Sequence, residues 1–418
     1  MGITRQACIL VGGKGTRLGP LAHAMPKPLL EIAPGVAFLD FLIEEVTRQG
    51  FTDVLLLAGH LGTMVYERYH GRTFGAGHIR VLIESEPLGT GGALKSARDL
   101  LAPQHLLLNG DSFFDVNLRA LASDASDCTA VLALRRVSDA SRYGTVDLVG
   151  SRIVRFHEKS PDVPGEAVAN GGIYVLSSTL VDRVKKTAFS LESELFPSLA
   201  ADGALSGAIQ DGYFLDIGVP AALEQGRREL PSLRRRLAAF LDRDGVINYD
   251  HGYVYRRDQV RWIPGAIDAV RRLNDLGYRV IVVTNQAGIA HGYFREEDVH
   301  KLHAWMQDEL AVQGAYIDAF YHCPYHPEAR VDRYRASHND RKPGPGMIFR
   351  AASDLPIDMS RSFLIGDKES DLEAARRAGL RGFLFDGGDL ASFVGDCLAK
   401  LNLSSLRAGV TVGQARSP

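Results

Sequence analysis

The chain has 418 residues, of which 45% are hydrophobic and 23% are charged. These fractions are usual for globular proteins and exclude a wholly disordered chain, and the length predicts roughly two to three domains. The 48 basic and 50 acidic residues leave a net charge of −2, which argues against a protein that coats nucleic acid or binds a membrane surface. No apolar run approaches the roughly 18 residues that a membrane span requires.

The N-terminus and the cysteines predict the compartment of the protein. The first residues lead straight into a strand-like run, so we expect no signal peptide. The chain holds four scattered cysteines: Cys8, Cys128, Cys323 and Cys397. Because they make no disulfide framework, they point to a reducing compartment. We therefore expect a cytoplasmic protein, and leave open whether it is a monomer or a homo-oligomer.

Short apolar runs alternate with segments of helical periodicity along the whole chain. In the first half the predicted strands are residues 8–11, 54–58, 79–83, 106–108 and 130–134, and the predicted helices are residues 38–49 and 93–101. The pattern restarts with strands at residues 238–241, 280–283 and 363–365, and with a helix that ends before Gly277. Repeated strand–helix–strand order predicts largely parallel or mixed sheets covered by helices.

The two halves are predicted to meet at a basic helix rather than at a flexible linker. Residues 221–237 contain five arginines near their end, which we interpret as a solvated helix face and not as a phosphate site. We place the domains at residues 1–230 and 231–405. Residues 406–418 lose their periodicity, and we expect them to form a frayed tail.

A glycine cluster follows the first predicted strand, in the sequence Leu-Val-Gly-Gly-Lys-Gly-Thr-Arg-Leu at residues 10–18. Glycines let a backbone approach a phosphate closely and turn its N–H groups inward. A dinucleotide fingerprint would need glycine at Leu18, and a P-loop has another spacing. Alone, the cluster fits either a phosphate loop or a tight turn. Lys27 favours the phosphate loop, because Pro26 and Pro28 hold its compact charge in place.

This glycine loop and the following Pro-Lys-Pro resemble the signature of the sugar-1-phosphate nucleotidyltransferases. Further segments follow in the family's order: residues 84–93, 109–111, 142–144, 158–159, 170–172 and 216–218. Each segment alone could be a turn or a helix cap, but their common order makes that explanation improbable. The resemblance implies a Rossmann-like domain with a mixed sheet.

The implied reaction is attack of a sugar's anomeric phosphate on the α-phosphorus of a nucleoside triphosphate, with pyrophosphate leaving. Because charge spreads over oxygens of both groups, catalysis is mostly positioning and electrostatics. By resemblance, Arg17 and Lys27 neutralise the transition state. The family's Mg²⁺ ligands correspond to Asp111 and Asp216. The implied nucleotide-binding residues are Gly12, Gly13, Gly15, Thr16, Glu84 and Gly89. The implied sugar-phosphate-binding residues are Gly144, Glu158, Lys159 and Asn170.

Within this family, residues 86–92, 109–115 and 141–144 resemble the heptose-1-phosphate guanylyltransferases. That resemblance predicts GTP as the donor. Base choice turns on few contacts, and Glu84 is our candidate for the contact with the base. The anomer of the sugar is left open.

Two aspartates, Asp242 and Asp244, follow the predicted strand at residues 238–241. Side chains two residues apart share one face of an extended segment, so both carboxylates can meet one substrate and one metal ion. An isolated pair of this kind is commonly a turn or a weak cation site. Here Thr284, Lys342 and Asp367 stand further along the chain, and with them the segment resembles the haloacid-dehalogenase phosphatases, with all four motifs present.

That resemblance implies a second Rossmann-like domain and covalent catalysis with Mg²⁺. Asp242 would attack phosphorus, while Asp244 would protonate the leaving sugar oxygen and then activate water. Mg²⁺ would be held by Asp242, Asp367 and the backbone carbonyl of Asp244. The phosphoryl oxygens would be bound by Thr284 and Lys342. Asp371 either supports this site or caps a helix.

Residues 250–254, 284–290, 322–327 and 341–347 resemble the heptose-1,7-bisphosphate phosphatases, with histidinol-phosphatases as near relatives. By analogy, Asn285 and Arg341 reach the substrate's other phosphate or hydroxyls. Relatives often carry a structural zinc, but its four ligand positions read Cys323, Tyr325, His338 and Asp340 here. Tyrosine is a poor zinc ligand. We expect a loop held by packing and hydrogen bonds without zinc. The alternative is a site improvised from His326, His338 and Asp340.

The two implied reactions are consecutive, because removal of the C7 phosphate leaves heptose 1-phosphate, the acceptor for nucleotidyl transfer. Tethering can raise the local concentration of that intermediate. The sequence therefore predicts a bifunctional enzyme of nucleotide-activated heptose synthesis that acts on small molecules, without nucleic acid or membrane partners. One alternative is another hexose 1-phosphate nucleotidyltransferase beside a generic or histidinol-phosphate-like phosphatase. Another is a silent sugar-nucleotide-binding regulator, against which the intact set of charged residues argues.

Overall fold

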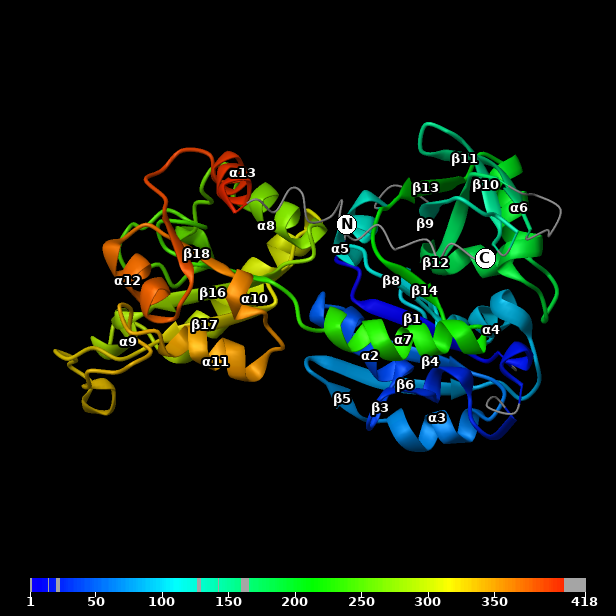
Figure 1. Ribbon diagram of the computed structural model, residues 1–418, viewed down its shortest axis with the longest axis horizontal. Helices are drawn as coiled ribbons and strands as arrows, with labels where there is room; N and C mark the ends of the chain where they lie inside the picture. The colour runs from blue at the N-terminus through cyan, green and yellow to red at the C-terminus, as the bar shows by residue number, and fades with distance from the viewer. Residues whose placement is uncertain are drawn as a thin grey trace, which may run out of the picture. The chain divides into compact units, whose positions relative to one another are not determined.

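The computed structural model describes residues 2–13, 15–19, 23–125, 129–141, 143–158 and 165–401. Contacts divide the chain into two compact units, Met1–Arg234 and Arg235–Pro418, coloured blue to green and green to red in Figure 1. The predicted domain boundary after residue 230 falls inside α7 (Pro220–Leu233). The predicted tail at residues 406–418 lies outside the described residues.

The N-terminal unit is built on a ten-stranded mixed sheet in the order β10-β11-β13-β9-β12-β7-β1-β4-β6-β5. β1 (Gln6–Val11) lies in its interior and pairs in parallel with β4 (Asp53–Ala58) and β7 (Gln104–Asn109). The other strands are β5 (Thr73–Phe74), β6 (Gly77–Ile83), β9 (Ala130–Val137), β10 (Thr145–Val149), β11 (Arg152–His157), β12 (Ala167–Ser177) and β13 (Leu205–Ile209). Antiparallel pairs of β12 with β7 and β9 make the sheet mixed, as predicted.

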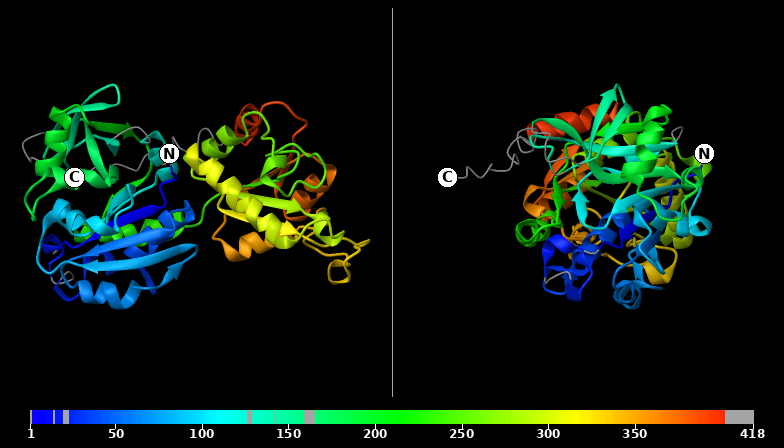
Figure 2. Two further views of the ribbon diagram at one scale, coloured as in Figure 1. Left: turned by 180° about the vertical axis from the view of Figure 1, so that it is seen from behind. Right: turned by 90° about the vertical axis from the view of Figure 1, so that its right-hand side faces the viewer.

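Helices cover both faces of this sheet, as Figure 2 shows from two further sides. Alternate residues of β1 face opposite ways, so that Ile9 packs with α2 (Phe38–Arg48) and Cys8 packs with α4 (Gly89–Ser96). The other elements of the unit are α3 (Gly62–Tyr69), α5 (Leu118–Asp124), α6 (Phe196–Ala201), β2 (Glu31–Ala33), β3 (Val36–Ala37), β8 (Ser112–Phe114) and β14 (Phe214–Asp216).

One helix differs from the sequence-based expectation. The helix predicted at residues 93–101 begins earlier, at Gly89, and ends at Ser96, with a 3-10 turn at Arg98–Leu100. A Cβ at Gly91 would lie 2.1 Å from the ring of Phe189, and one at Gly92 would lie 2.4 Å from a backbone carbonyl oxygen. Tertiary packing therefore selects glycine in this first turn, although glycine disfavours helices in isolation.

The C-terminal unit has a five-stranded, all-parallel sheet in the order β17-β16-β15-β18-β19. Its strands are β15 (Ala238–Leu241), β16 (Arg279–Asn285), β17 (Ala319–Cys323), β18 (Phe363–Gly366) and β19 (Arg381–Leu384). One face packs against α8 (Ala266–Asp275), α10 (Glu296–Val312) and α13 (Leu390–Lys400), and the other against α11 (Gly346–Asp354) and α12 (Glu369–Arg377). A short helix, α9 (Ala287–Ala290), follows β16. The α/β class predicted for both halves is confirmed.

The arginines near the boundary behave differently from the expectation. α7 ends at Leu233, and beyond it the Arg234 guanidinium pairs with Glu44 at 2.5 Å. Arg236 is only 6% exposed. The interpretation of this run as a solvated helix face is therefore wrong for Arg236, which is buried and whose backbone pairs with Ile357 of the second unit.

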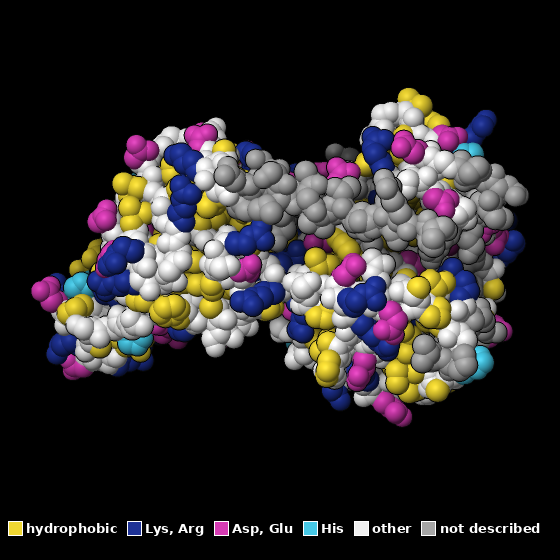
Figure 3. Space-filling view, in the orientation of Figure 1, with side chains coloured by type: hydrophobic (Ala, Val, Ile, Leu, Met, Phe, Trp, Pro, Cys, Tyr) yellow, Lys and Arg dark blue, Asp and Glu magenta, His cyan; other side chains and the backbone are white. Residues whose placement is uncertain are grey.

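Charge and hydropathy at the surface agree with the composition. Basic and acidic side chains are interspersed on the face shown in Figure 3, and the whole chain has a net charge of −2. Among the described residues, no helix is both long and apolar enough to cross a bilayer.

A buried histidine makes the N-terminal unit sensitive to acid. Burial lowers the pKa of His105 on β7 from 6.5 to about 4. Because the folded state binds this proton less readily than the unfolded chain, stability is present above pH 6.5 and is lost as the pH falls toward 4. At pH 5 the loss is about 2 kcal/mol. We expect His105→Gln to reduce the shift in urea midpoint between pH 7 and pH 5, followed by circular dichroism. An equal shift in both proteins would contradict this.

Two candidate active sites

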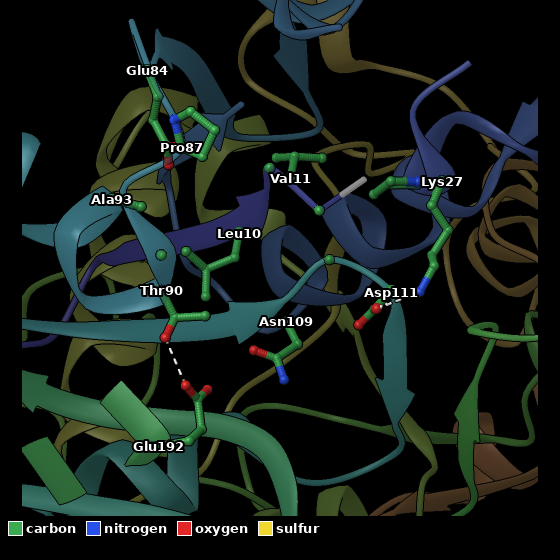
Figure 4. Close-up of a pocket in the computed structure, with 15 residues that line it drawn as sticks. Leu10, Val11, Lys27, Glu84, Pro87, Thr90, Ala93, Asn109, Asp111 and Glu192 are labelled. Carbon is green, nitrogen blue, oxygen red and sulfur yellow. Dashed lines mark hydrogen bonds and ion pairs between the residues drawn. The ribbon is translucent and has the colours of Figure 1, made fainter. Parts of the chain in front are cut away.

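The first candidate site is a pocket of about 340 Å³ in the N-terminal unit, drawn in Figure 4. It forms where β1, β6 and β7 end, so residues just after each strand line it. Ligands of open α/β sheets commonly bind at such carboxyl ends. The lining residues are Leu10, Val11, Gly12, Gly13, Lys27, Pro28, Glu84, Pro87, Gly89, Thr90, Ala93, Asn109, Gly110, Asp111 and Glu192.

Two of the predicted catalytic groups form an ion pair at this pocket. Lys27 Nζ lies 2.7 Å from Asp111 Oδ2, with the lysine buried and the carboxylate about one-third exposed (Figure 4). Lys27 begins a 3-10 turn, Lys27–Leu29, that follows Pro26. The turn therefore fixes the lysine backbone, and the ion pair places a positive and a negative charge side by side where a phosphate and a metal ion would need them.

Asp216 and Arg17 reach the same place from other parts of the chain. β14 pairs with β8 so that Asp216 lies opposite Ser112, and the Ile217 N–H donates to the Asp111 carbonyl at 3.0 Å. A Cβ at Gly218 would lie 2.7 Å from Asp216 Oδ1 and 3.0 Å from Arg17 Nη2. The end of β14 therefore lies beside Asp111, and Arg17 lies near Asp216, although neither Asp216 nor Arg17 lines the pocket itself. Carboxylate oxygens are the donors that Mg²⁺ prefers, so the chemistry of Asp111 and Asp216 suits the ion.

The glycine loop lies close to the wall that carries Glu84. A Cβ at Gly12 would lie 3.4 Å from the Gly59 nitrogen and 3.7 Å from Glu84 Oε1, so the loop and this wall are in near contact. Gly15 and Gly89 have positive φ angles of 61° and 74°, which side chains other than glycine rarely adopt. Burial raises the pKa of Glu84, whose carboxylate accepts the Leu88 N–H at 3.4 Å.

The opposite wall of the pocket carries an acidic side chain, Glu192, that the sequence did not indicate. Glu192 Oε2 accepts from Thr90 Oγ1 at 2.6 Å, as Figure 4 shows, and from Ser190 Oγ at 2.8 Å. The buried Tyr174 hydroxyl donates to Glu192 Oε1 at 3.5 Å. No local motif marks Glu192, because it lies in a π-helical turn, Leu191–Leu195, and only the fold brings it to the pocket.

The predicted sugar-phosphate residues are only partly gathered. Asn170 Nδ2 donates to the Tyr174 hydroxyl at 2.8 Å, and the Asn170 N–H donates to the Gly144 carbonyl at 2.9 Å. These two predicted residues therefore join the network behind Glu192. Glu158 is exposed and does not line the pocket. Lys159 lies outside the described residues, as does the side chain of Thr16.

The second candidate site lies where β15, β16 and β18 end in the C-terminal unit. Lys342 Nζ lies 2.8 Å from Asp242 Oδ1 and 2.6 Å from Asp371 Oδ1, and it donates to the Val283 carbonyl at 2.9 Å. The lysine and both aspartates are buried. Burial alone would lower the pKa of Lys342, but the two carboxylates together raise it. The site therefore has a buried cation in contact with the predicted nucleophile.

The carboxylates around Lys342 fit a hard cation. Oxygens of Asp242, Asp367 and Asp371 lie within 4.8 Å of one another. Burial raises the pKa of Asp242 to about 6 against the pull of Lys342, and burial also raises the pKa of Asp367. Asp367 Oδ1 is buried without a hydrogen-bond partner in the described part of the chain. A cation bound by these oxygens would satisfy that atom, and oxygen donors suit Mg²⁺.

Asp244 is held by three donors, of which the sequence suggested none. Its carboxylate accepts from Arg243 Nη2 at 2.8 Å, Asn248 Nδ2 at 2.9 Å and Gln286 Nε2 at 2.9 Å. Gln286 also donates to Thr284 Oγ1 at 2.9 Å, which links this network to a predicted phosphate ligand. Arg243 is fully buried. These contacts fix the orientation of the predicted acid and base.

Asp371 and Asn285 both position Lys342. Asp371 pairs with the lysine through Oδ1 and accepts the Lys368 N–H at 3.0 Å through Oδ2, so the two interpretations left open for it are both correct. Asn285 donates to the Lys342 carbonyl at 3.2 Å and accepts the Lys342 N–H at 3.0 Å. Arg341 Nη1 donates to the Tyr325 carbonyl at 3.5 Å. Direct substrate contacts of Asn285 and Arg341 stay predictions.

The positions that correspond to the zinc ligands of relatives make contacts with other side chains in this structure. His338 stacks on Tyr325 with ring centroids 4.2 Å apart, and Asp340 pairs with Arg350 at 2.6 Å. Cys323 is buried, and burial raises the pKa of its thiol to about 11. These contacts hold the positions in the structure, and the expectation of a loop without zinc stays a prediction.

Comparisons with known proteins cover both units. Residues 6–232 match the family model described as nucleotidyl transferase, and residues 339–392 match the model described as HAD-hydrolase-like. The D-glycero-beta-D-manno-heptose-1,7-bisphosphate 7-phosphatase of Rhodopseudomonas palustris is 52% identical over 175 residues, which are 42% of this chain and 97% of the relative. The D-glycero-alpha-D-manno-heptose-1,7-bisphosphate 7-phosphatase of Burkholderia mallei is 48% identical over 34% of this chain and 76% of its own.

A solved structure resembles the N-terminal part. The crystal structure of HddC from Yersinia pseudotuberculosis is 27% identical, covers 54% of this chain and 100% of that chain, and has a TM-score of 0.49.

Proposed function

Because the chain belongs to the nucleotidyl transferase family in its N-terminal half and to the family of the heptose-1,7-bisphosphate 7-phosphatases in its C-terminal part, we propose that it is a bifunctional enzyme of nucleotide-activated heptose synthesis. It removes the C7 phosphate of D-glycero-D-manno-heptose 1,7-bisphosphate and transfers GMP from GTP to the resulting heptose 1-phosphate. The observation that carries the proposal is the presence, on one chain, of a buried Asp242–Lys342 site and a pocket with a Lys27–Asp111 pair.

The phosphatase reaction begins with attack of an Asp242 carboxylate oxygen on phosphorus. A P–O bond to Asp242 forms, the bond from phosphorus to the sugar oxygen breaks, and Asp244 gives its proton to that oxygen. Asp244 then takes a proton from the water that attacks the phosphoaspartate, which releases phosphate. Lys342 and Thr284 hold the phosphoryl oxygens throughout. Asp242, Asp367 and the Asp244 carbonyl would hold Mg²⁺, whose charge offsets that of the phosphoryl group.

In the N-terminal pocket, an oxygen of the sugar's 1-phosphate attacks the α-phosphorus of the nucleotide, and the bond to the β-phosphate oxygen breaks to release pyrophosphate. The backbone of Gly12, Gly13 and Gly15 would hold the triphosphate. Lys27 and Arg17 neutralise the oxygens on which charge develops. Asp111 and Asp216 would hold Mg²⁺, which screens the phosphates from one another.

We assign the choice of base to the wall that carries Glu84 and the choice of sugar to the wall that carries Glu192. The Glu84 carboxylate can accept the two neighbouring N–H donors on the edge of guanine, a pattern that adenine lacks, which supports GTP as the donor. Glu192, Thr90 and the network to Asn170 offer polar atoms for sugar hydroxyls. Binding of the acceptor's phosphate by Gly144, Glu158 and Lys159 stays a prediction from the family resemblance.

The test is a substrate panel with the full-length protein and Mg²⁺. For the phosphatase, phosphate release would be measured with both anomers of the heptose bisphosphate and with histidinol phosphate. For the nucleotidyltransferase, pyrophosphate release would be measured with heptose, mannose and glucose 1-phosphates, each with every nucleoside triphosphate. We expect phosphate release from the heptose bisphosphate, transfer to heptose 1-phosphate with GTP, and loss of both when Mg²⁺ is chelated. A preference for histidinol phosphate or for a hexose 1-phosphate would contradict the proposal, and binding without turnover would indicate a regulator.

Glu192 gives a prediction specific to the acceptor. We expect Glu192→Gln to raise the KM for the sugar 1-phosphate about 10- to 100-fold, because a charge-assisted hydrogen bond becomes a neutral one. The KM for the nucleotide should change little. Glu194→Gln is the matched control, since Glu194 stands two residues away and pairs with Lys186 outside the pocket. An unchanged acceptor KM in Glu192→Gln would show that Glu192 does not bind the sugar.

A further inference from the structure

A second group of metal-ligating side chains lies in the C-terminal unit, distinct from the phosphatase aspartates. Glu296 and His300 are one turn apart on α10, and His322 lies on β17. The ligand atoms of the three side chains all lie within 4.8 Å of one another. None of the three has a part in the reactions described above.

Helix spacing and strand parity explain why these three side chains lie together. Residues four apart on a helix share one face, so Glu296 and His300 point the same way. His322 has the same strand parity as Phe320, which packs in the core that contains α10, so its ring faces that helix. His322 Nε2 lies 3.0 Å from Glu296 Oε1, and the rings of His300 and His322 are 5.3 Å apart.

Burial and neighbouring groups favour coordination at this place. The His322 side chain is 10% exposed, whereas Glu296 is 37% exposed and His300 is exposed, so the group is closed on one side and open to water on the other. The neutral imidazole ring is the form of histidine that binds metal ions.

The Tyr334 hydroxyl donates to Glu296 Oε2 at 3.1 Å and leaves Oε1 toward the histidines. An outer hydrogen bond of this kind orients a metal ligand. His303 is nearby, but its Nε2 lies 3.2 Å from Arg243 Nη1, so it belongs to the network around Asp244.

We propose that Glu296, His300 and His322 bind a divalent transition-metal ion of the Zn²⁺ type, with water in the fourth position. Two imidazoles and one carboxylate form a donor set that zinc takes and that Mg²⁺, which prefers oxygen, does not. In a tetrahedral site with bonds of about 2.1 Å the ligand atoms are about 3.4 Å apart, a spacing within the 4.8 Å that the group spans.

The ion would connect α10 to β17, and through Tyr334 it would also reach the segment between Cys323 and Lys342. β17 pairs with β16 so that His322 lies opposite Thr284, a residue of the phosphatase site. The metal would therefore stabilise the unit beside that site without contacting the substrate. By linkage, a ligand that binds only the folded state raises its melting temperature.

Metal binding by the full-length protein tests the proposal. After chelation of all metals and with millimolar Mg²⁺ present to occupy the aspartates, Zn²⁺ would be titrated in competition with a chromophoric chelator, and Co²⁺ would be followed by its visible absorption. We expect one Zn²⁺ per chain, intense Co²⁺ bands typical of tetrahedral coordination, and a rise in Tm on adding Zn²⁺.

Two variants assign the site. His300→Gln removes one ligand from an exposed position and leaves the His322–Glu296 hydrogen bond intact, so it should fold normally and lose at least about 100-fold in Zn²⁺ affinity. His338→Gln, in the loop with the other candidate ligands, should bind as the wild type does. Loss of binding in His338→Gln with full binding in His300→Gln would assign the metal to that loop and overturn the proposal. Absence of Zn²⁺ binding by the wild type would overturn it as well.

Discussion

Asp242→Asn is expected to lower phosphate release from heptose 1,7-bisphosphate by at least about 10⁴-fold in kcat, a loss typical of removing a covalent nucleophile. The amide keeps the size of the side chain, but it cannot form the phosphoaspartate and no longer offers a charge to Lys342, 2.8 Å away. Pyrophosphate release with heptose 1-phosphate and GTP should be unchanged, because that chemistry belongs to the other unit.

Asp258→Asn is the matched control for this variant, since Asp258 is an exposed aspartate of the same unit. It should retain both activities. Residual phosphatase activity of Asp242→Asn within about tenfold of the wild type would show that another group attacks phosphorus. Parallel loss of nucleotidyl transfer in a normally folded Asp242→Asn protein would show that the two reactions are not separate.

The second large effect is expected for Asp111→Asn, which should lower nucleotidyl transfer about 10³-fold or more and leave phosphate release unchanged. Asp111 is at once the partner of Lys27, at 2.7 Å, and a proposed Mg²⁺ ligand beside Asp216. Removing its charge weakens the metal site and frees Lys27 from its position, so transition-state stabilisation is lost from both groups. The measurement is the rate of pyrophosphate release at saturating GTP.

Asp182→Asn serves as the control in the N-terminal unit, because Asp182 is half exposed and pairs with Arg98 at the surface. If raising the Mg²⁺ concentration restores part of the activity of Asp111→Asn, the residue acts mainly through the metal. A normal rate for Asp111→Asn at ordinary Mg²⁺ would refute its assignment to the site.

Elements buried on both faces could be predicted from the sequence with good accuracy. Residues 8–11 form an unbroken apolar run because Cys8 and Ile9 enter cores on opposite faces of the sheet. The strands that carry Asp111 and Asp242 follow the same rule, so both aspartates could be placed at strand ends. Positions set by tertiary packing could not be predicted: the glycines at the start of α4 exist because Phe189 leaves no room for a side chain.

The residues of the two candidate sites also fall into those that a local motif indicates and those that only the fold brings into place. Lys27, Asp111, Asp242 and Lys342 lie in short motifs that the sequence singled out, and the structure brings them together in two ion pairs. Residues that act across the fold carried no such signal. Arg243 looks like an ordinary charged neighbour of the two aspartates, yet it is fully buried and holds Asp244. Glu192 reaches its pocket only through the turn that places it beside Thr90.

The proposed function requires one chain to carry out two consecutive reactions on a heptose phosphate. The most direct measurement is ³¹P NMR of the full-length protein with Mg²⁺, GTP and heptose 1,7-bisphosphate in a single tube, with Asp242→Asn as the comparison. We expect loss of the C7 phosphate signal, appearance of inorganic phosphate, and then pyrophosphate together with the diphosphate signals of a nucleotide sugar. Asp242→Asn should give none of these products. Unchanged spectra with both anomers of the heptose, from a protein that turns over another sugar phosphate, would contradict the claim.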